Sequence, residues 1–320
     1  MLSTLSLVYP PMSNQEAEWV KSDPHVEERI RKSDLYLIGA RNEATFHPTI
    51  SNEKDVRFTI TTGDNLSDEV ILIASELAHD ALGYVPDFIS VDFGPKLVQF
   101  FDGKLADVDQ SPDVEPFAWF TTEKLIHDRG RDVAGVRGFN RFREFAKYDL
   151  LYVGIAKSTD TFSRLFDGAH QARQRALSNE RPRRTGARVT DELFLFPLKV
   201  VPLVLRELDV GDSLSSKSYQ DWVAHSKTIV VDAEKALVSL LGPDYNVEQF
   251  RSFPKSTDGL YGYGYERYGF VLAENMTFAT VDQSFVGSRT ALGLSDEYAD
   301  LVVVSDSGVE LRKGQPRSSV

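Results

Sequence analysis

One glutamate lies on an otherwise apolar helix face. In the stretch AEKALVSLLGPDYN, helical spacing places Glu234 on the same side as Leu237 and Leu241, and Gly242 ends the helix. An ionised carboxylate left alone among apolar side chains is strongly unfavourable, or it takes up a proton. The spacing therefore predicts a cation beside Glu234.

The choice of metal ligands in the chain is limited. It has no cysteine, which excludes disulfides and thiolate zinc sites, and its six histidines are scattered along the sequence. A hard divalent ion held by carboxylate oxygens fits this composition.

A basic segment lies in the middle of an acidic chain. Residues 151–190 carry eight basic and three acidic residues, whereas the whole chain has a formal net charge of −12. The basic residues are Lys157, Arg164, Arg173, Arg175, Arg181, Arg183, Arg184 and Arg188. Because phosphate binding draws its affinity from Lys and Arg, this segment could contact a nucleic-acid backbone. A solvated, Arg-rich helix and loop is the alternative.

The composition is that of a globular protein, and the length of 320 residues favours two or three domains. No apolar run approaches the ~20 residues of a membrane span. The N-terminal sequence lacks the basic start and the cleavage site of a signal peptide. We therefore expect a cytoplasmic protein with no membrane partner.

The elements that must position these residues follow from the periodicity. The N-terminal third predicts a helix over about 67–82, capped by Ser67 and closed by Gly83. The polar stretch DVDQSPDVEP marks a boundary near residue 115. The predicted strands of the N-terminal third are DLYLIGA, ATFHPTI, DVRFTITTG, FISVDF and KLVQFFDG.

The middle segment, 116–250, alternates predicted strands and helices. Its strands are FAWFTT, YDLLYVGIAK and ELFLFPLKVV, and its helices cover about 161–179 and 218–241. Period-2 spacing places Tyr148 and Tyr152 on one face of their strand. Residues 251–320 form a β-rich C-terminal segment, and residues 1–115 an α/β accessory domain, so the predicted fold class is α+β.

Two stretches of the middle segment occur in the order typical of the GIY-YIG nucleases. LYVGIAKSTDTFSRLFDGAH resembles the second half of their signature, in which a Tyr-Val-Gly strand leads into a helix with Arg-Leu and then His. AEKALVSLLGPDYN resembles their helix in which a Glu precedes Pro-x-Tyr-Asn, and Asn246 follows Glu234 by twelve residues, as in that family. The resemblance covers about residues 116–250 and implies a small mixed sheet with flanking helices.

The resemblance also implies a set of site residues. Glu234 would bind one divalent ion, Mg²⁺ or Mn²⁺, and Arg164 would hold the phosphate and its transition state. Tyr152 would donate a hydrogen bond or act as a general base. The other candidates for the base are Tyr148, Lys157 and His170. Nucleic-acid contacts are expected from Arg173, Arg181, Arg183, Arg184, Arg188 and Asn246.

The sequence departs from the family at two places. It has no GIY tripeptide upstream, and FAWFTT is the strand expected to replace it, with Trp119 or Phe120 in place of the first tyrosine. About 70 residues separate Arg164 from Glu234, which indicates an insertion within PLVLRELDVGDSLSSKSY.

Each candidate also fits a structural role. Tyr152 could pack in a core, Arg164 and Glu234 could form a buried ion pair, and His170 could lie on the surface. Asn246 could be only a turn residue.

The expected function is a metal-dependent endonuclease, a hydrolase that cleaves DNA or RNA, with DNA favoured. By analogy it would serve restriction, repair or phage defence. The alternatives are an inactive nucleic-acid-binding module and a protein-interaction module on the same fold. A homodimer or a regulatory partner bound by the flanking domains is left open.

Overall fold

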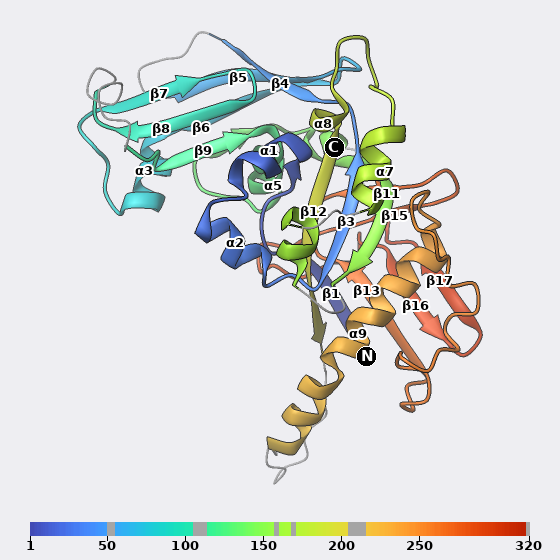
Figure 1. Ribbon diagram of the computed structural model, residues 1–320. Coiled ribbons are helices and arrows are strands. Elements are labelled where there is room, and N and C mark those ends of the chain that lie inside the picture. The colour runs from blue at the N-terminus through green and yellow to red at the C-terminus, as the bar shows by residue number, and fades with distance from the viewer. Residues whose placement is uncertain (50–54, 105–113, 157–159, 168–170, 204–215, 318–320) are drawn as a thin grey trace. The chain divides into compact units, whose positions relative to one another are not determined.

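The computed structural model describes the chain except residues 50–54, 105–113, 157–159, 168–170, 204–215 and 318–320 (Figure 1). The side chains of residues 167 and 216–224 also lie outside the description. The fold is α+β, as predicted. No helix in the described part of the chain is both long and apolar enough to cross a membrane.

The chain divides into two units whose segments alternate along the sequence. Unit 1 comprises residues 1–40, 148–181 and 193–320, and unit 2 comprises residues 41–147 and 182–192. The boundaries expected near residues 115 and 250 do not coincide with this division. The reason is that the first strand of the chain pairs with the strands of residues 193–203 and 267–272, so both ends of the sequence build one sheet.

A large mixed sheet organises unit 1. Its strand order is β15-β14-β11-β3-β12-β1-β13-β16-β17, and β2 pairs with β12 at the side. β1 and β13 are parallel, whereas β1 and β12, β12 and β3, β3 and β11, β13 and β16, and β16 and β17 are antiparallel. The strands are β1 (Leu2–Leu7), β2 (Met12–Ser13), β3 (Leu35–Ala40), β11 (Lys147–Ile155), β12 (Leu193–Leu203), β13 (Arg267–Leu272), β14 (Thr277–Ala279), β15 (Ser284–Val286), β16 (Leu301–Ser305) and β17 (Gly308–Arg312).

The helices of unit 1 are α1 (Asn14–Val20), α2 (Pro24–Ile30), α7 (Gln171–Asn179) and α9 (Ser216–Leu241). The helix predicted over 218–241 is confirmed as α9, which packs against β3, β12, β16 and β17 (Figure 1). The helix predicted over 161–179 is not one regular α-helix, because η1 (Ser163–Asp167) is a single turn of π-helix before α7. Such turns are frequent at functional sites.

Unit 2 contains two small antiparallel sheets. One has the order β10-β6-β5-β4 and the other β7-β8-β9. The strands are β4 (Ala44–Pro48), β5 (Asp55–Thr62), β6 (Ser67–Ile73), β7 (Ile89–Phe93), β8 (Leu97–Asp102), β9 (Ala118–Thr121) and β10 (Val136–Gly138). The helices are α3 (Ala74–Leu82), α5 (Thr122–Gly130), α6 (Phe142–Phe145) and α8 (Val189–Glu192).

The helix predicted over 67–82 is wrong in its first half. Residues 67–73 form β6, which pairs with β5 and buries Val70 and Leu72 at alternate positions. Period-2 burial between two partner strands therefore prevails over the capping signal at Ser67. Gly83 closes α3 as predicted, with a left-handed φ of 80° that suits glycine.

Candidate active site

The strand beside β11 is β3, and this corrects the expected first strand of the site. β3 lies between β11 and β12 and is antiparallel to both. FAWFTT contains β9, which pairs with β8 in unit 2, and Phe120 is buried there. The sequence prediction missed Tyr36 because residues 41–146 separate β3 from β11. Its signal was a tyrosine in an apolar strand, DLYLIGA.

Tyr36 and Tyr152 lie together at one end of the β3–β11 pair. Their ring centroids are 5.9 Å apart with an interplanar angle of 29°. Gly154 is the register partner of Tyr36. A Cβ at Gly154 would lie 2.5 Å from the Tyr152 ring and 2.7 Å from the Tyr36 hydroxyl, so only glycine leaves room for both rings.

Arg164 completes this group, which we call the tyrosine–arginine cluster (Tyr36, Tyr152, Arg164). Its Nε donates a 2.8 Å hydrogen bond to the Tyr36 hydroxyl, although 128 residues separate the two. The segment before Arg164 is fixed by Asp160, which accepts from the Ser163 amide at 2.9 Å, and by Thr161, whose hydroxyl donates to the carbonyl of Ser33 at 2.9 Å.

The surroundings of Tyr36 and Arg164 keep both side chains protonated. Burial, together with nearby Tyr152, raises the pKa of Tyr36 despite the opposing effect of Arg164. Partial burial alone would lower the pKa of Arg164, but the hydrogen bond to Tyr36 and the nearness of both phenols outweigh it, and its pKa is raised. Tyr36 is therefore a neutral hydroxyl that orients a permanent cation.

Arg164 is exposed, and its side chain is hydrogen-bonded to the neutral Tyr36 hydroxyl. Tyr36 accepts one hydrogen bond from the guanidinium but does not neutralise its charge. Tyr152 also bonds to the guanidinium, and a guanidinium has five N–H donors, so donors not used by the two phenols can bind an external anion.

Tyr148 belongs to the opposite face of β11, which corrects its assignment as a candidate base. The register shifts between Leu150 and Tyr152, so Leu151 is an extra residue that reverses the alternation. Tyr148 is buried against Phe194, Phe196 and Phe278. It is a core residue.

Glu234 is buried in the middle of α9, with 8% of its surface exposed. The helix is buried on all sides from Asp232 to Val238, so Glu234 lies inside unit 1. Within the part of the chain that is described, no group of three or more acidic or histidine side chains is arranged to hold a metal ion.

α9 and the tyrosine–arginine cluster approach the sheet from opposite faces. On β3, Tyr36 and Leu37 point to opposite sides, and Leu37 is paired with Phe196. Pairing through β1 and β13 places Tyr268 on the side of Phe196, and Tyr268 donates a 2.5 Å hydrogen bond to Asp232 of α9. Glu234 and the tyrosine–arginine cluster therefore lie on opposite faces of the sheet.

Asn246 ties the segment after α9 to β11, which corrects its assignment as a nucleic-acid contact. Its amide accepts from the Val153 N–H at 2.9 Å and donates to the Val153 carbonyl at 2.8 Å. The Tyr245 N–H donates to the carbonyl of Leu151 at 3.0 Å. Asn246 is buried, and both ends of its amide are used between Tyr152 and Gly154.

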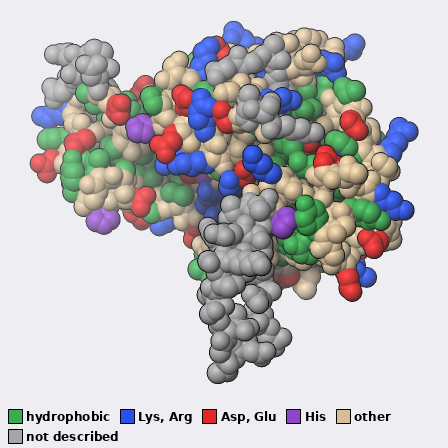
Figure 2. Space-filling view, turned by 60° about the horizontal axis from the view of Figure 1, so that its bottom comes forward, with side chains coloured by type: hydrophobic (Ala, Val, Ile, Leu, Met, Phe, Trp, Pro, Cys, Tyr) green, Lys and Arg blue, Asp and Glu red, His purple; other side chains and the backbone are tan. Residues whose placement is uncertain are grey.

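The predicted arginine contacts divide into two groups. Arg173 is a structural residue, because its Nε donates to Asn14 at 2.6 Å, a guanidinium nitrogen donates to the Leu165 carbonyl, and burial lowers its pKa. The exposed ones are Arg181, Arg183, Arg184 and Arg188, of which the last three belong to unit 2. Figure 2 shows basic side chains interspersed with acidic ones over one face of the molecule.

Lys157 and His170 lie outside the described residues. The predicted insertion after β12 falls mostly within residues 204–215, which also lie outside them. Comparison of the chain with protein-family models, with curated proteins and with solved structures found no match.

Proposed function

We propose that this chain is a metal-dependent endonuclease of the GIY-YIG type that works in the cytoplasm. The observation that carries the proposal is the tyrosine–arginine cluster. Tyr36 would take the place of the first tyrosine, for which the sequence analysis expected Trp119 or Phe120 of FAWFTT. Tyr152 and Arg164 follow it in the order of the signature and lie beside it.

Arg164 would bind the phosphate that is attacked. A guanidinium offers paired donors that match phosphate oxygens and stabilises the additional negative charge of the transition state. Tyr36 holds Arg164 in position through the 2.8 Å bond and remains protonated. Tyr152, which is more exposed than Tyr36, is the phenol placed to contact the attacking water or the substrate. Lys157 and His170 are further candidates for the general base.

A single Mg²⁺ or Mn²⁺ is the proposed cofactor, with Glu234 as its protein ligand. The donor chemistry fits, because a carboxylate and phosphate oxygens are the hard ligands that these ions prefer. The ion would neutralise the buried charge of Glu234 and supply Lewis-acid catalysis. The Asn246 clamp joins the segment after α9 to β11. Glu234 itself is buried on the other face of the sheet, so its action on the phosphate held by Arg164 is part of the proposal.

The proposed substrate is DNA, with RNA as the second choice. The exposed arginines Arg181, Arg183, Arg184 and Arg188 would contact the backbone. An inactive nucleic-acid-binding module is the second candidate, because Glu234 and the tyrosine–arginine cluster lie on opposite faces of the sheet. In that case Arg164 would bind phosphate without cleavage.

The test is incubation of the purified chain with plasmid DNA and with single-stranded RNA, with and without Mn²⁺ or Mg²⁺. We expect nicking or linearisation of plasmid that requires the metal and stops with EDTA. Retention of DNA without cleavage, with an affinity that falls steeply with salt, would support the binding module instead. If the chain neither binds nor cleaves DNA or RNA, both candidate functions are excluded.

A further inference from the structure

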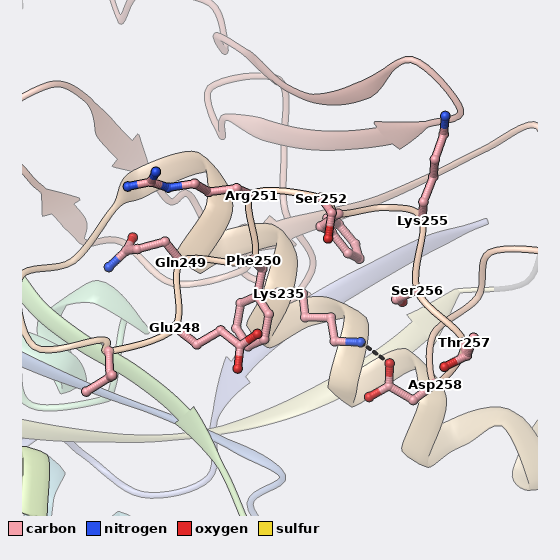
Figure 3. Close-up of a pocket in the computed structure, with 12 residues that line it drawn as sticks. Lys235, Glu248, Gln249, Phe250, Arg251, Ser252, Lys255, Ser256, Thr257 and Asp258 are labelled. Atoms are coloured by element: carbon pink, nitrogen blue, oxygen red, sulfur yellow. Dashed lines mark hydrogen bonds and ion pairs between the residues drawn. The ribbon is translucent and has the colours of Figure 1, made fainter.

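A second site with ligand-binding chemistry lies in unit 1, away from the tyrosine–arginine cluster. It is an open pocket of about 750 Å³ between α9 and the loop of residues 247–258. Lys235, Phe250, Ser252, Ser256 and Asp258 line it, and Figure 3 shows the Lys235 side chain ending at the Asp258 carboxylate. Its volume is in the range of small-molecule sites, roughly 300–1,000 Å³.

The ion pair in the pocket is asymmetric. The Lys235 side chain is 5% exposed, whereas that of Asp258 is 61% exposed. A buried ammonium requires an anionic partner, because an uncompensated buried charge is strongly destabilising. An exposed carboxylate on a loop loses little on returning to water. An anion from solution can therefore replace Asp258 at Lys235.

An aromatic ring lies beside this cation. The Lys235 ammonium is 6.0 Å from the centroid of the Phe250 ring. Phe250 has φ 47°, a left-handed conformation that is unfavourable for a bulky residue. Such backbone strain persists where the surrounding structure holds a side chain in place, frequently at ligand sites. The half-buried ring offers a flat surface to a planar ligand.

The pocket also has hydroxyl groups in its lining and two further basic side chains at its rim. Ser252, Ser256 and Thr257 line the pocket, and the Ser256 hydroxyl is buried with no hydrogen-bond partner among the described residues. Arg251 and Lys255 extend outward from the rim in Figure 3 and would attract an anion. Glu248 and Asp258 are the acidic residues of the lining.

We propose that this pocket binds a nucleoside phosphate. The phosphate takes the place of Asp258 at Lys235 and accepts from the loop hydroxyls, and the base lies against Phe250. A free nucleotide and the phosphorylated end of a nucleic-acid strand share this chemistry. The site is independent of the proposed nuclease activity, because binding in metal-free buffer involves no cleavage.

The test is isothermal titration calorimetry of the full chain in EDTA with AMP, adenosine, inorganic phosphate and a 5′-phosphorylated oligonucleotide. We expect AMP to bind more tightly than phosphate, and adenosine to bind at least ~10-fold more weakly than AMP, because charge-assisted hydrogen bonds are the stronger kind. Tighter binding of the oligonucleotide than of AMP would identify a strand end as the ligand, and the reverse a free nucleotide.

Variants make the assignment specific. Lys235→Met should weaken AMP binding at least ~10-fold, and Asp258→Asn should strengthen it by removing the competing carboxylate. Phe250→Leu should weaken AMP binding but leave phosphate binding unchanged. Lys199→Met removes a lysine from a surface pair with Asp34 and should change nothing.

Thermal unfolding measured by circular dichroism shows which variants fold. If Lys235→Met does not fold, AMP binding to Asp258→Asn and to Phe250→Leu tests the proposal. Absence of AMP binding to the unmodified chain, or equal affinity in Lys235→Met, Asp258→Asn and the unmodified chain, would overturn the proposal.

Discussion

Two arginines of this molecule have opposite surroundings. Arg41 in unit 2 is buried and paired with the Glu123 carboxylate, which also accepts from the Thr122 hydroxyl at 2.6 Å. Arg164 in unit 1 is exposed and bonded to the neutral hydroxyl of Tyr36. The charge of Arg41 is cancelled within the protein, so it serves stability. The charge of Arg164 is oriented but still available to an anion, which is the property that a phosphate site needs.

The largest expected effect concerns the proposed metal ligand. Glu234→Gln keeps the side-chain volume and removes the charge that would bind the ion, so cleavage of plasmid should fall by more than ~100-fold. Circular dichroism should show a folded protein. Cleavage at the original rate in this variant would exclude Glu234 as the ligand.

Breaking the buried ion pair of Arg41 and Glu123 should change the stability of the protein rather than its activity. Glu123→Ala leaves Arg41 buried without its carboxylate and should lower the free energy of unfolding by about 3–5 kcal/mol. Glu144→Ala, which removes the exposed partner of Arg141, should change it by only about 0–1 kcal/mol. Urea unfolding measures both. Equal losses of unfolding free energy in the two variants would contradict the distinction between buried and exposed ion pairs.

Tyr36→Phe tests the positioning role of the hydroxyl. The ring and its stacking on Tyr152 remain, but Arg164 loses its hydrogen bond, so kcat should fall about 10-fold, the effect of roughly 1.4 kcal/mol. Tyr148→Phe is the matched control on the opposite face of β11 and should leave kcat unchanged. A similar fall in both variants would indicate a general effect on the sheet.

A smaller effect concerns pH. Burial alone would raise the pKa of Asp128, but the hydrogen bond from His127 and the charge of Lys124 outweigh it, and its pKa is lowered. Its stabilising contribution is therefore present above the unfolded-state pKa of about 4 and is lost as pH falls through the folded-state value. The unmodified chain should lose more unfolding free energy below pH ~4 than Asp128→Asn does. Parallel pH profiles would contradict this.

The sequence predicted local elements better than their partners. Helical spacing and Gly-Pro predicted the end of α9 correctly, because both signals are local. FAWFTT was expected as the first strand of the site, but the strand that pairs with β11 there is β3, because strand pairing depends on contacts across residues 41–146 that no local pattern reveals. Arg164 and Tyr152 could be selected from the motif order. Tyr36 could not, since its identity depends on that pairing.

Two errors have simple physical causes. Period-2 spacing assigned Tyr148 and Tyr152 to one face, but a single extra residue, Leu151, reverses the alternation. Asn246 was predicted to contact nucleic acid, but it is buried and its amide bonds to both backbone groups of Val153, which its position after the helix does not show.

The most direct test of the central claim compares Arg164→Ala with Arg175→Ala. Both arginines are exposed, and they lie eleven residues apart in the same basic segment. Plasmid cleavage in Mn²⁺ should fall by about 10²- to 10³-fold in Arg164→Ala and stay near the original rate in Arg175→Ala. Equal rates in the two variants, or an unmodified chain that does not cleave DNA or RNA with any divalent ion, would contradict the assignment of Arg164 as the phosphate-binding group of a nuclease.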